Sequence, residues 1–139
     1  MSIIGPHLEG ARILDLFAGT GALGLEALSR GAVEVHFVES SLASLTALRS
    51  NVEALGVSDR SHILRGNAMT FLGKLGHEHY DLALADPPYA TDYAERVVRA
   101  FRQQPFARML AVEHASTVTI AGDDTRRYGD TSITFCHGP

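Results

Sequence analysis

The segment from Ile13 to Gly24, ILDLFAGTGALG, constrains the fold of this chain more than any other stretch. A short apolar run leads into Gly19, Gly21 and Gly24, which have the spacing Gly-x-Gly-x-x-Gly, and the helix-favouring run ALGLEALSR overlaps the last of them. A buried strand, a sharp glycine turn and a helix are typical of the first half of a βαβ unit. The segment therefore predicts a parallel sheet with a ligand-binding loop at its first crossover.

The rest of the chain continues the alternation of strands and helices. Further apolar runs predict strands at 33–39, 62–66, 80–86 and 108–114, after a first strand at 12–18. Helical patterns fill the intervals, and Asp92 with Glu95 resembles a capping box that starts the last helix. The tail has no room for a normal helix, so 116–122 and 131–136 are predicted to be two antiparallel strands. This pattern indicates an α/β fold with helices on both faces of a mainly parallel sheet.

The composition is that of one globular domain spanning residues 1–139. Apolar residues make up 45% of the chain, but no apolar run approaches the ~20 residues that span a bilayer, and the first residues lack a signal-peptide pattern. The single cysteine, Cys136, excludes an internal disulfide and fits a reducing compartment. We therefore expect a cytoplasmic protein with no membrane partner. The net charge of −4 gives no support to nucleic-acid binding.

Asp15 helps to decide which ligand the glycine loop holds. In a dinucleotide site, a pyrophosphate rests on the helix N-terminus. In an S-adenosylmethionine site, the loop contacts the amino acid and ribose, and a nearby carboxylate can hold the ammonium group. Asp15 lies in the first strand, just before the loop, where a carboxylate beside pyrophosphate would be unfavourable. Asp15 thus favours S-adenosylmethionine over a nicotinamide cofactor, whereas Glu39, at the end of the second strand, could accept hydrogen bonds from the ribose hydroxyls of either.

The segment Asp86 to Tyr89, DPPY, follows the fourth predicted strand and so lies at the same edge of the sheet as the glycine loop. Its two prolines make a stiff loop, and a rigid turn is the plain structural interpretation. The Asp86 carboxylate and the Pro87 carbonyl can also accept the N–H groups of an exocyclic amine while Tyr89 stacks on the base. Because Asp86 would offset positive charge on the attacking nitrogen, the loop predicts methyl transfer to an amino group.

Three other features have weaker implications. Asn67 could contact an adenine edge, with the Ala68 amide beside it, or could be a turn residue. Arg96, Arg99 and Arg102 recur on one helix face, which is more often a solvated face than a nucleic-acid contact. The seven histidines, including the pair at 77 and 79, show no metal-ligand spacing, so no metal is predicted.

These motifs together resemble one known family. DLFAGTGALGLEALSRGA, FVES, NAMTFL, YDLALADPPY and YGDTSITF are similar to the bacterial small-subunit ribosomal RNA guanine-N2 methyltransferases, and the likeness runs from Arg12 onward. It implies a class I S-adenosylmethionine-dependent, Rossmann-like three-layer sandwich with strand order 3-2-1-4-5-7-6 and an antiparallel C-terminal strand. The implied cofactor-binding residues are Asp15, Phe17, Ala18, Gly19, Thr20, Gly21, Glu39, Ser40, Asn67 and Ala68, and the implied catalytic residues are Asp86, Pro87, Pro88 and Tyr89.

The resemblance also implies a substrate and leaves alternatives open. The expected partner is ribosomal RNA or the small ribosomal subunit, with a guanine amino group as the acceptor. Family members have a longer basic segment before the first strand, whereas eleven residues precede Arg12 here. We therefore expect a shortened N-terminus, with a partner or oligomer supplying the missing RNA-binding surface. The alternatives are an S-adenosylmethionine-binding domain with weak or no activity alone, and an adenine-N6 methyltransferase, which also uses DPPY.

Overall fold

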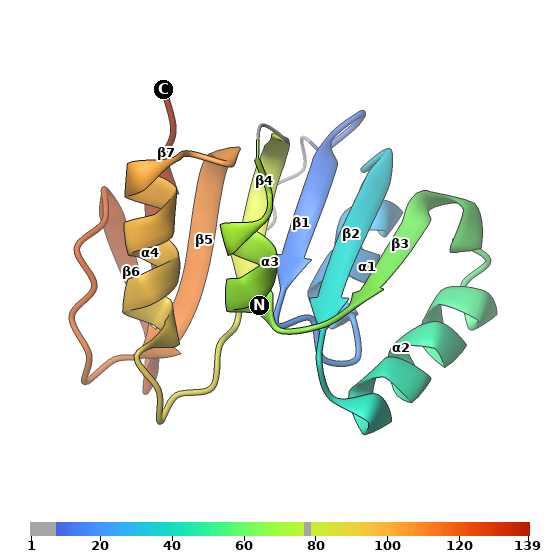
Figure 1. The fold of residues 1–139 in the computed structure, drawn as a ribbon, viewed down its shortest axis with the longest axis horizontal. Helices are drawn as coiled ribbons and strands as arrows, with labels where there is room; N and C mark the ends of the chain where they lie inside the picture. The colour runs from blue at the N-terminus through green and yellow to red at the C-terminus, as the bar shows by residue number, and fades with distance from the viewer. Residues whose placement is uncertain (1–7, 77–78) are drawn as a thin grey trace.

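A mainly parallel sheet forms the centre of the protein because five apolar segments alternate with helical crossovers (Figure 1). The computed structural model describes residues 8–76 and 79–139. The strands are β1 (Arg12–Leu16), β2 (Glu34–Glu39), β3 (Ser61–Arg65), β4 (Tyr80–Ala85), β5 (Ala107–Ala115), β6 (Asp124–Tyr128) and β7 (Thr131–His137). The helices are α1 (Ala22–Ser29), α2 (Leu42–Ala54), α3 (Ala68–Gly73) and α4 (Tyr93–Gln103), with a 3-10 turn, η1 (Ser58–Arg60), before β3.

The strand order confirms the predicted fold class. The seven-stranded sheet has the order β3-β2-β1-β4-β5-β7-β6. Strands β1 to β5 pair in parallel, while β7 runs antiparallel to both β5 and β6. The order reverses between β1 and β4, which is where open α/β sheets bind ligands.

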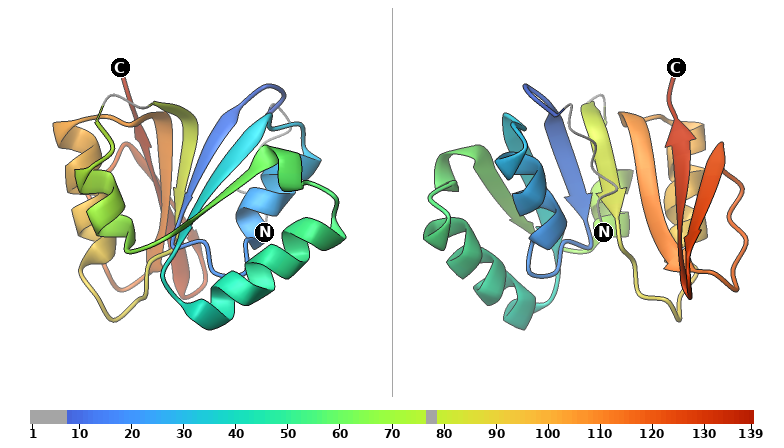
Figure 2. Two further views of the ribbon diagram at one scale, coloured as in Figure 1. Left: turned by 45° about the vertical axis from the view of Figure 1, so that its right-hand side comes forward. Right: turned by 180° about the vertical axis from the view of Figure 1, so that it is seen from behind.

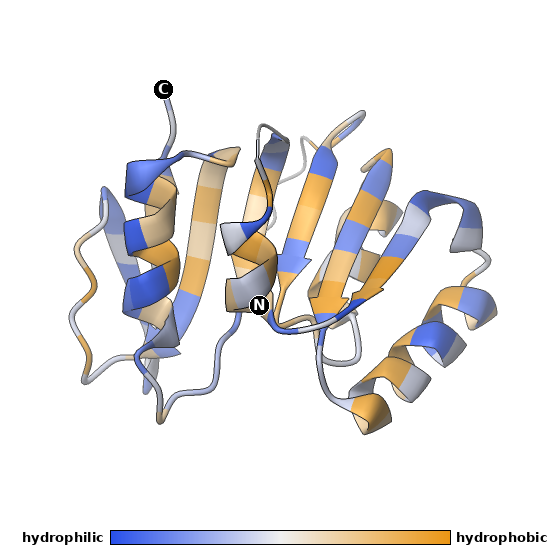
Figure 3. Cartoon of the chain, viewed as in Figure 1, coloured by the Kyte–Doolittle hydropathy of each residue, from blue (hydrophilic) through white to orange (hydrophobic). Residues whose placement is uncertain are grey.

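Helices on both faces make three layers (Figure 2). On one face, α1 and α2 cover a cluster that includes Ile13, Phe37 and Leu48. On the other face, α3 and α4 cover a cluster that includes Leu16 and Phe101. Successive strand residues point to opposite faces, and β4 and β5 are mainly apolar on both, as their orange and pale bands show in Figure 3. Within the residues described, no helix has the length and apolar character needed to cross a membrane.

The tail differs from the prediction in one strand. The predicted strand at 116–122 is wrong: these residues form turns and irregular backbone, and β6 consists of Asp124–Tyr128 instead. All five residues of β6 are exposed, because β6 is the edge strand and neither of its faces is covered. Its charged sequence DTRRY therefore lacks the apolar alternation by which strands are recognised, and charged residues are typical of a protected edge.

Two of the three predicted helix-end features are confirmed. Ser41 caps α2 by accepting a hydrogen bond from the Ser44 amide, and Gly31 follows α1 with a φ of 103°. The capping box at Asp92 is wrong, because the Asp92 side chain makes no capping bond. The Thr91 hydroxyl accepts from the Tyr93 amide at 3.3 Å instead.

Candidate active site

The ends of β1 and β4 bring the glycine loop and the DPPY loop to one cavity. The two strands are paired in register, with Leu16 opposite Ala85, so the loops that follow them begin side by side at the lower edge of Figure 1. The cavity between these loops has a volume of about 270 Å³. Its lining residues are Asp15, Phe17, Ala18, Gly19, Thr20, Ala22, Leu23 and Asp86. Asp86 therefore shares one cavity with the glycine loop, although some seventy residues separate them in the sequence, whereas Pro87, Pro88 and Tyr89 line a separate small hollow.

Two glycines of the loop are required by close packing. Gly21 has a φ of 86°, and a Cβ atom there would lie 2.3 Å from a methyl group of Leu48 on α2. A Cβ atom on Gly24 would lie 2.4 Å from the Phe37 ring and 2.9 Å from a carboxylate oxygen of Asp15. These glycines allow α1 to begin directly against the sheet, which fixes the position of the loop.

The residue that joins β1 to the loop has unusual backbone geometry. Phe17 has a φ of 56°, the single positive φ of a non-glycine residue among those described. Its ring packs against Tyr93 at the start of α4, with 5.5 Å between ring centroids. Such strained conformations occur where a site must hold a particular backbone shape. The contact therefore anchors the cavity wall to α4.

Asp15 has both a structural and a site-facing position. Its side chain is only 2% exposed and accepts a hydrogen bond from the Gly24 amide at 3.1 Å. Burial raises the pKa of Asp15 to about 8, although the Gly24 amide opposes this shift. The charges of Asp86 and Glu39 raise this pKa further. Asp15 is thus mostly protonated at neutral pH and would ionise beside a cation.

Glu39 holds the glycine loop and the following turn together. One carboxylate oxygen accepts from the Gly19 amide at 2.6 Å, and the other accepts from the amides of Ser40 and Ser41 at 3.0 and 2.8 Å. A carboxylate has about four acceptor positions. In this arrangement the oxygen that faces Gly19 retains one position for a ligand, whereas the other oxygen is fully used by the backbone. The predicted pairing of both oxygens with a ribose would therefore require the turn to move.

One polar contact between α2 and the glycine loop was not predicted from the sequence. The Asn51 amide group donates to the Thr20 carbonyl at 3.0 Å, which attaches the tip of the glycine loop to α2. In the sequence, Asn51 is one polar residue in an amphipathic helix. No local signal distinguishes it from its solvent-exposed neighbours.

Asp86 has an acidic neighbour that the sequence analysis also missed. Glu113 lies on β5, the strand next to β4, and interacts with the Asp86 carboxyl group. Asp86 is exposed at the cavity rim, but the protein atoms around its carboxyl group raise its pKa to about 6, and the charge and hydrogen bonding of Glu113 raise it as well. The available signal was a lone acid in the apolar run LAVEH, near the end of a parallel strand.

The DPPY loop is fixed at both ends. Pro87 is buried, and the Pro88 carbonyl accepts from the Thr91 hydroxyl at 2.7 Å. The Tyr89 hydroxyl lies 2.7 Å from the Thr131 hydroxyl oxygen at the start of β7 and 3.5 Å from a Glu113 oxygen. The Tyr89 side chain remains 47% exposed. The loop therefore presents an aromatic ring to solvent in a defined position.

The other predicted cofactor residues lie outside the lining of the cavity. Ser40 follows β2 and is exposed, and Asn67 and Ala68 follow β3 at the same edge of the sheet. The Asn67 side chain caps α3 by accepting from the amides of Met69 and Thr70. Asn67 is therefore a helix cap and not the predicted turn residue, and its contact with an adenine remains a prediction.

Among the described residues, no arginine lines the cavity. Arg96 pairs with Asp92 at 3.7 Å and Arg102 with Asp123 at 3.3 Å, which supports a solvated helix face. Arg126 in the tail pairs with Asp124. Of the two histidines at 77 and 79, the first lies outside the described residues.

Comparisons with known proteins agree with this geometry. The family described as Conserved hypothetical protein 95 matches residues 1–136. The chain is 36% identical over 95 residues to ribosomal RNA small subunit methyltransferase D of Escherichia coli, a match that covers 68% of this chain and 47% of the relative. The chain thus spans about half the length of this curated relative, and 59% of the methyltransferase D of Haemophilus influenzae.

Solved structures show the same fold. A conserved hypothetical protein from Streptococcus pyogenes superposes with a TM-score of 0.86 at 28% identity, covering 96% of this chain and 89% of that one. A methyltransferase described as complexed with SAH superposes with a TM-score of 0.76, covering 93% of this chain and 45% of that one. At 14% identity, the second likeness shows the fold alone.

Proposed function

Since the chain belongs to the Conserved hypothetical protein 95 family, in which curated relatives are ribosomal RNA small subunit methyltransferases, we propose that it transfers a methyl group from S-adenosylmethionine to small-subunit ribosomal RNA. The proposed acceptor is the exocyclic N2 amino group of a guanine. One observation carries the proposal: the glycine loop and Asp86 of the DPPY loop line the same cavity. A cofactor on one loop would then face an amine on the other.

The cofactor side of the cavity fits a ligand with a cationic amino-acid end. Asp15 is buried beside the loop, and a nearby ammonium group would favour its ionised form. The loop amides and the remaining acceptor position on Glu39 would hold the ribose. In the proposal, Ser40, Asn67 and Ala68 lie near the adenine. When bound, S-adenosylmethionine supplies an electrophilic methyl group. A nicotinamide dinucleotide fits less well, because its pyrophosphate would lie beside ionised Asp86 and would leave the buried Asp15 without a cation to pair with.

The substrate side would act mainly by holding the amine. The Asp86 carboxylate and the Pro87 carbonyl would accept the two N–H bonds of the guanine amino group, and Tyr89 would stack on the base. Held in this way, the guanine nitrogen would direct its lone pair toward the methyl group that the bound cofactor would supply. Positive charge develops on the nitrogen, where ionised Asp86 offsets it. One N–H proton leaves through the Asp86–Glu113 pair to solvent.

A methylation assay tests the proposal. Small ribosomal subunits from cells that lack the chain's activity would be incubated with the purified chain and labelled S-adenosylmethionine, and the nucleosides would then be identified by mass spectrometry. N2-methylguanosine is the expected product. N6-methyladenosine would replace the guanine proposal with the adenine alternative, and binding of the cofactor without any methylated nucleoside would favour a binding domain.

The alternative of a binding domain with weak or no activity alone has one observation in its favour, namely that the chain covers about half the length of its curated relatives. If a partner supplies an RNA-binding surface, methylation that the purified chain does not perform alone should appear when cell extract depleted of this protein is added. Calorimetry with S-adenosylmethionine and with NAD provides a separate check on the cofactor. Binding of NAD but not of S-adenosylmethionine would refute the proposal as a whole.

A further inference from the structure

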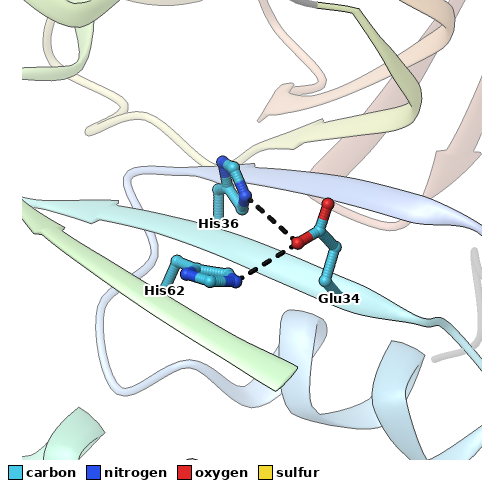
Figure 4. A group of neighbouring side chains, drawn as sticks. All are labelled: Glu34, His36 and His62. Carbon is cyan, nitrogen blue, oxygen red and sulfur yellow. Dashed lines mark ion pairs between the residues drawn. The ribbon is translucent and has the colours of Figure 1, made fainter. Parts of the chain in front are cut away.

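Three potential metal ligands meet on the sheet surface far from the cavity (Figure 4). Glu34 and His36 are two residues apart on β2 and so point to the same face of the sheet. His62 on β3 is the register partner of His36 and points to that face as well. The group lies near the amino ends of β2 and β3, whereas the candidate active site lies at the carboxyl ends of the strands. It therefore has no part in the chemistry proposed above.

The ligand atoms have the spacing of a metal site. One carboxylate oxygen of Glu34 lies 3.2 Å from Nε2 of His62 and 3.6 Å from Nε2 of His36. Zinc in a tetrahedral site, with ligands at 2.0–2.1 Å, places neighbouring ligand atoms about 3.3 Å apart. The three atoms all lie within 4.8 Å of one another, so a small rotation of the imidazoles would complete the geometry.

Neighbouring residues hold two of these ligands in place. Nε of Arg12 donates to the other carboxylate oxygen of Glu34 at 2.5 Å, which turns the first oxygen toward the histidines. The Tyr80 hydroxyl lies 2.8 Å from Nδ1 of His36, which directs Nε2 of that ring toward Glu34. Metal-binding histidines and carboxylates are commonly oriented by such outer contacts.

The exposure of the group leaves room for an ion to enter. The side chains of Glu34 and His36 are 26% and 16% exposed, while that of His62 is 52% exposed. The edge of the sheet beyond β3 is open, because β3 is the end of the strand order. An ion held by three protein ligands would therefore keep its fourth position toward solvent.

From this arrangement we propose that Glu34, His36 and His62 form a zinc site that joins β2 to β3. Two imidazole nitrogens and one carboxylate oxygen are a ligand set that zinc accepts. Sequence spacing does not indicate such a site, because His62 comes from a different strand and only the parallel register brings it opposite His36. The ion would stabilise the β2–β3 pairing at the edge of the sheet.

The test is zinc titration by calorimetry of the full chain, without a histidine tag and after removal of metals by a chelator. We expect one bound ion per chain and a rise in melting temperature on adding zinc. His62→Ala should weaken zinc binding by at least about tenfold, since even outer-contact residues contribute that much. His137→Ala, which removes an exposed histidine at the end of β7, is the matched control and should bind zinc as the unchanged chain does.

Cobalt substitution gives an independent readout, since a four-coordinate cobalt site absorbs visible light strongly. The absorption should appear with one equivalent of cobalt and disappear in His62→Ala and Glu34→Gln. Circular dichroism and S-adenosylmethionine binding would show that the variants remain folded. Equal zinc affinity in His62→Ala and His137→Ala, or several weak ions with no effect on melting, would mean adventitious surface binding and would overturn the proposal.

Discussion

At the scale of single residues, Asp86 is the group whose chemistry the proposal depends on most. Asp86→Ala should retain cofactor affinity, because the carboxylate acts on the amine, but should lower kcat by at least about 100-fold, as the loss of a charge-stabilising group does. Radiolabelled methyl transfer and calorimetry measure the two quantities separately. Asp92→Ala is the control, since Asp92 is exposed and makes no capping bond. Parallel losses of cofactor binding and methyl transfer in Asp86→Ala would contradict this role.

Glu113 should control the pH at which Asp86 becomes active. Its charge raises the pKa of Asp86, which reaches about 6. Because Asp86 must be ionised to accept the amine, kcat/KM should rise with pH through this region. Glu113→Gln removes the like charge, so it should lower the pKa and move the acidic limb of the kcat/KM profile down by about 1 pH unit. An unmoved limb in this variant would show that Glu113 does not act through Asp86.

At single residues, the structure brings together several that the sequence motifs predicted for the site. Asp15, Gly19, Thr20 and Asp86 were assigned from the glycine loop and DPPY, and all four line the cavity. Glu113 and Asn51 were not found, because each reaches the site through the pairing or packing of an element distant in sequence. Such contacts depend on the tertiary arrangement, and local sequence patterns do not predict them.

At the scale of elements, the packing of α1 on the sheet depends on Gly24. Gly24→Ala should destabilise the protein by about 1–3 kcal/mol, because the added methyl group overlaps the Phe37 ring and approaches Asp15. Urea unfolding followed by circular dichroism measures the loss. Gly73→Ala, at the end of α3 with nothing within 4 Å of the new methyl group, should be neutral or stabilising by up to about 1 kcal/mol. Equal stabilities of the two variants would argue against the close packing.

The prediction of elements failed where burial does not shape the sequence. Strands β1, β4 and β5 are mainly buried and have apolar sequences. The edge strand β6 is exposed throughout, so its residues follow no apolar pattern. The apolar pattern at 116–122 instead predicts a strand that the structure does not contain. Ser116 instead begins the turn in which the Val118 amide bonds back to the Ala115 carbonyl. The position of β6 is set by its antiparallel pairing with β7, and this pairing is seen only in the folded structure.

At the scale of the whole molecule, the buried acid in the site makes stability depend on pH. Asp15 has a pKa of about 8 in the folded chain, against 3.8 as its ordinary value, so the folded state binds more protons than the unfolded state between these values. Stability from this group is therefore present at low pH and falls as pH rises from about 4 through about 8. Asp15→Asn should remove this dependence.

Comparison of unfolding free energies at pH 5 and pH 9 measures the effect. The stability of Asp15→Asn relative to the unchanged chain should improve toward pH 9 by on the order of a few kcal/mol. Saturating cofactor should reduce the difference, because a cation beside Asp15 favours its ionised form. The same relative stability at both pH values would show that the carboxyl group titrates normally.

The arrangement of the whole sheet was predictable because its rules are general. Parallel strands joined by helices need right-handed crossovers, and the resemblance of the motifs supplied the order that the structure confirms. The seven strands differ from the prediction in the location of one edge strand only. The strand order alone does not predict which side chains lie opposite one another on neighbouring strands, such as His36 and His62.

The three backbone amides held by Glu39 have a consequence for anyone who wishes to move this site into another protein. The Glu39 carboxylate links two loops by hydrogen bonds, so the glycine loop grafted alone would lack the contact that holds its conformation. A successful transplant would need the end of the neighbouring strand and its Ser40–Ser41 turn as well. The structural unit to transfer is thus the ends of two adjacent strands, which are separated in the sequence by a helix.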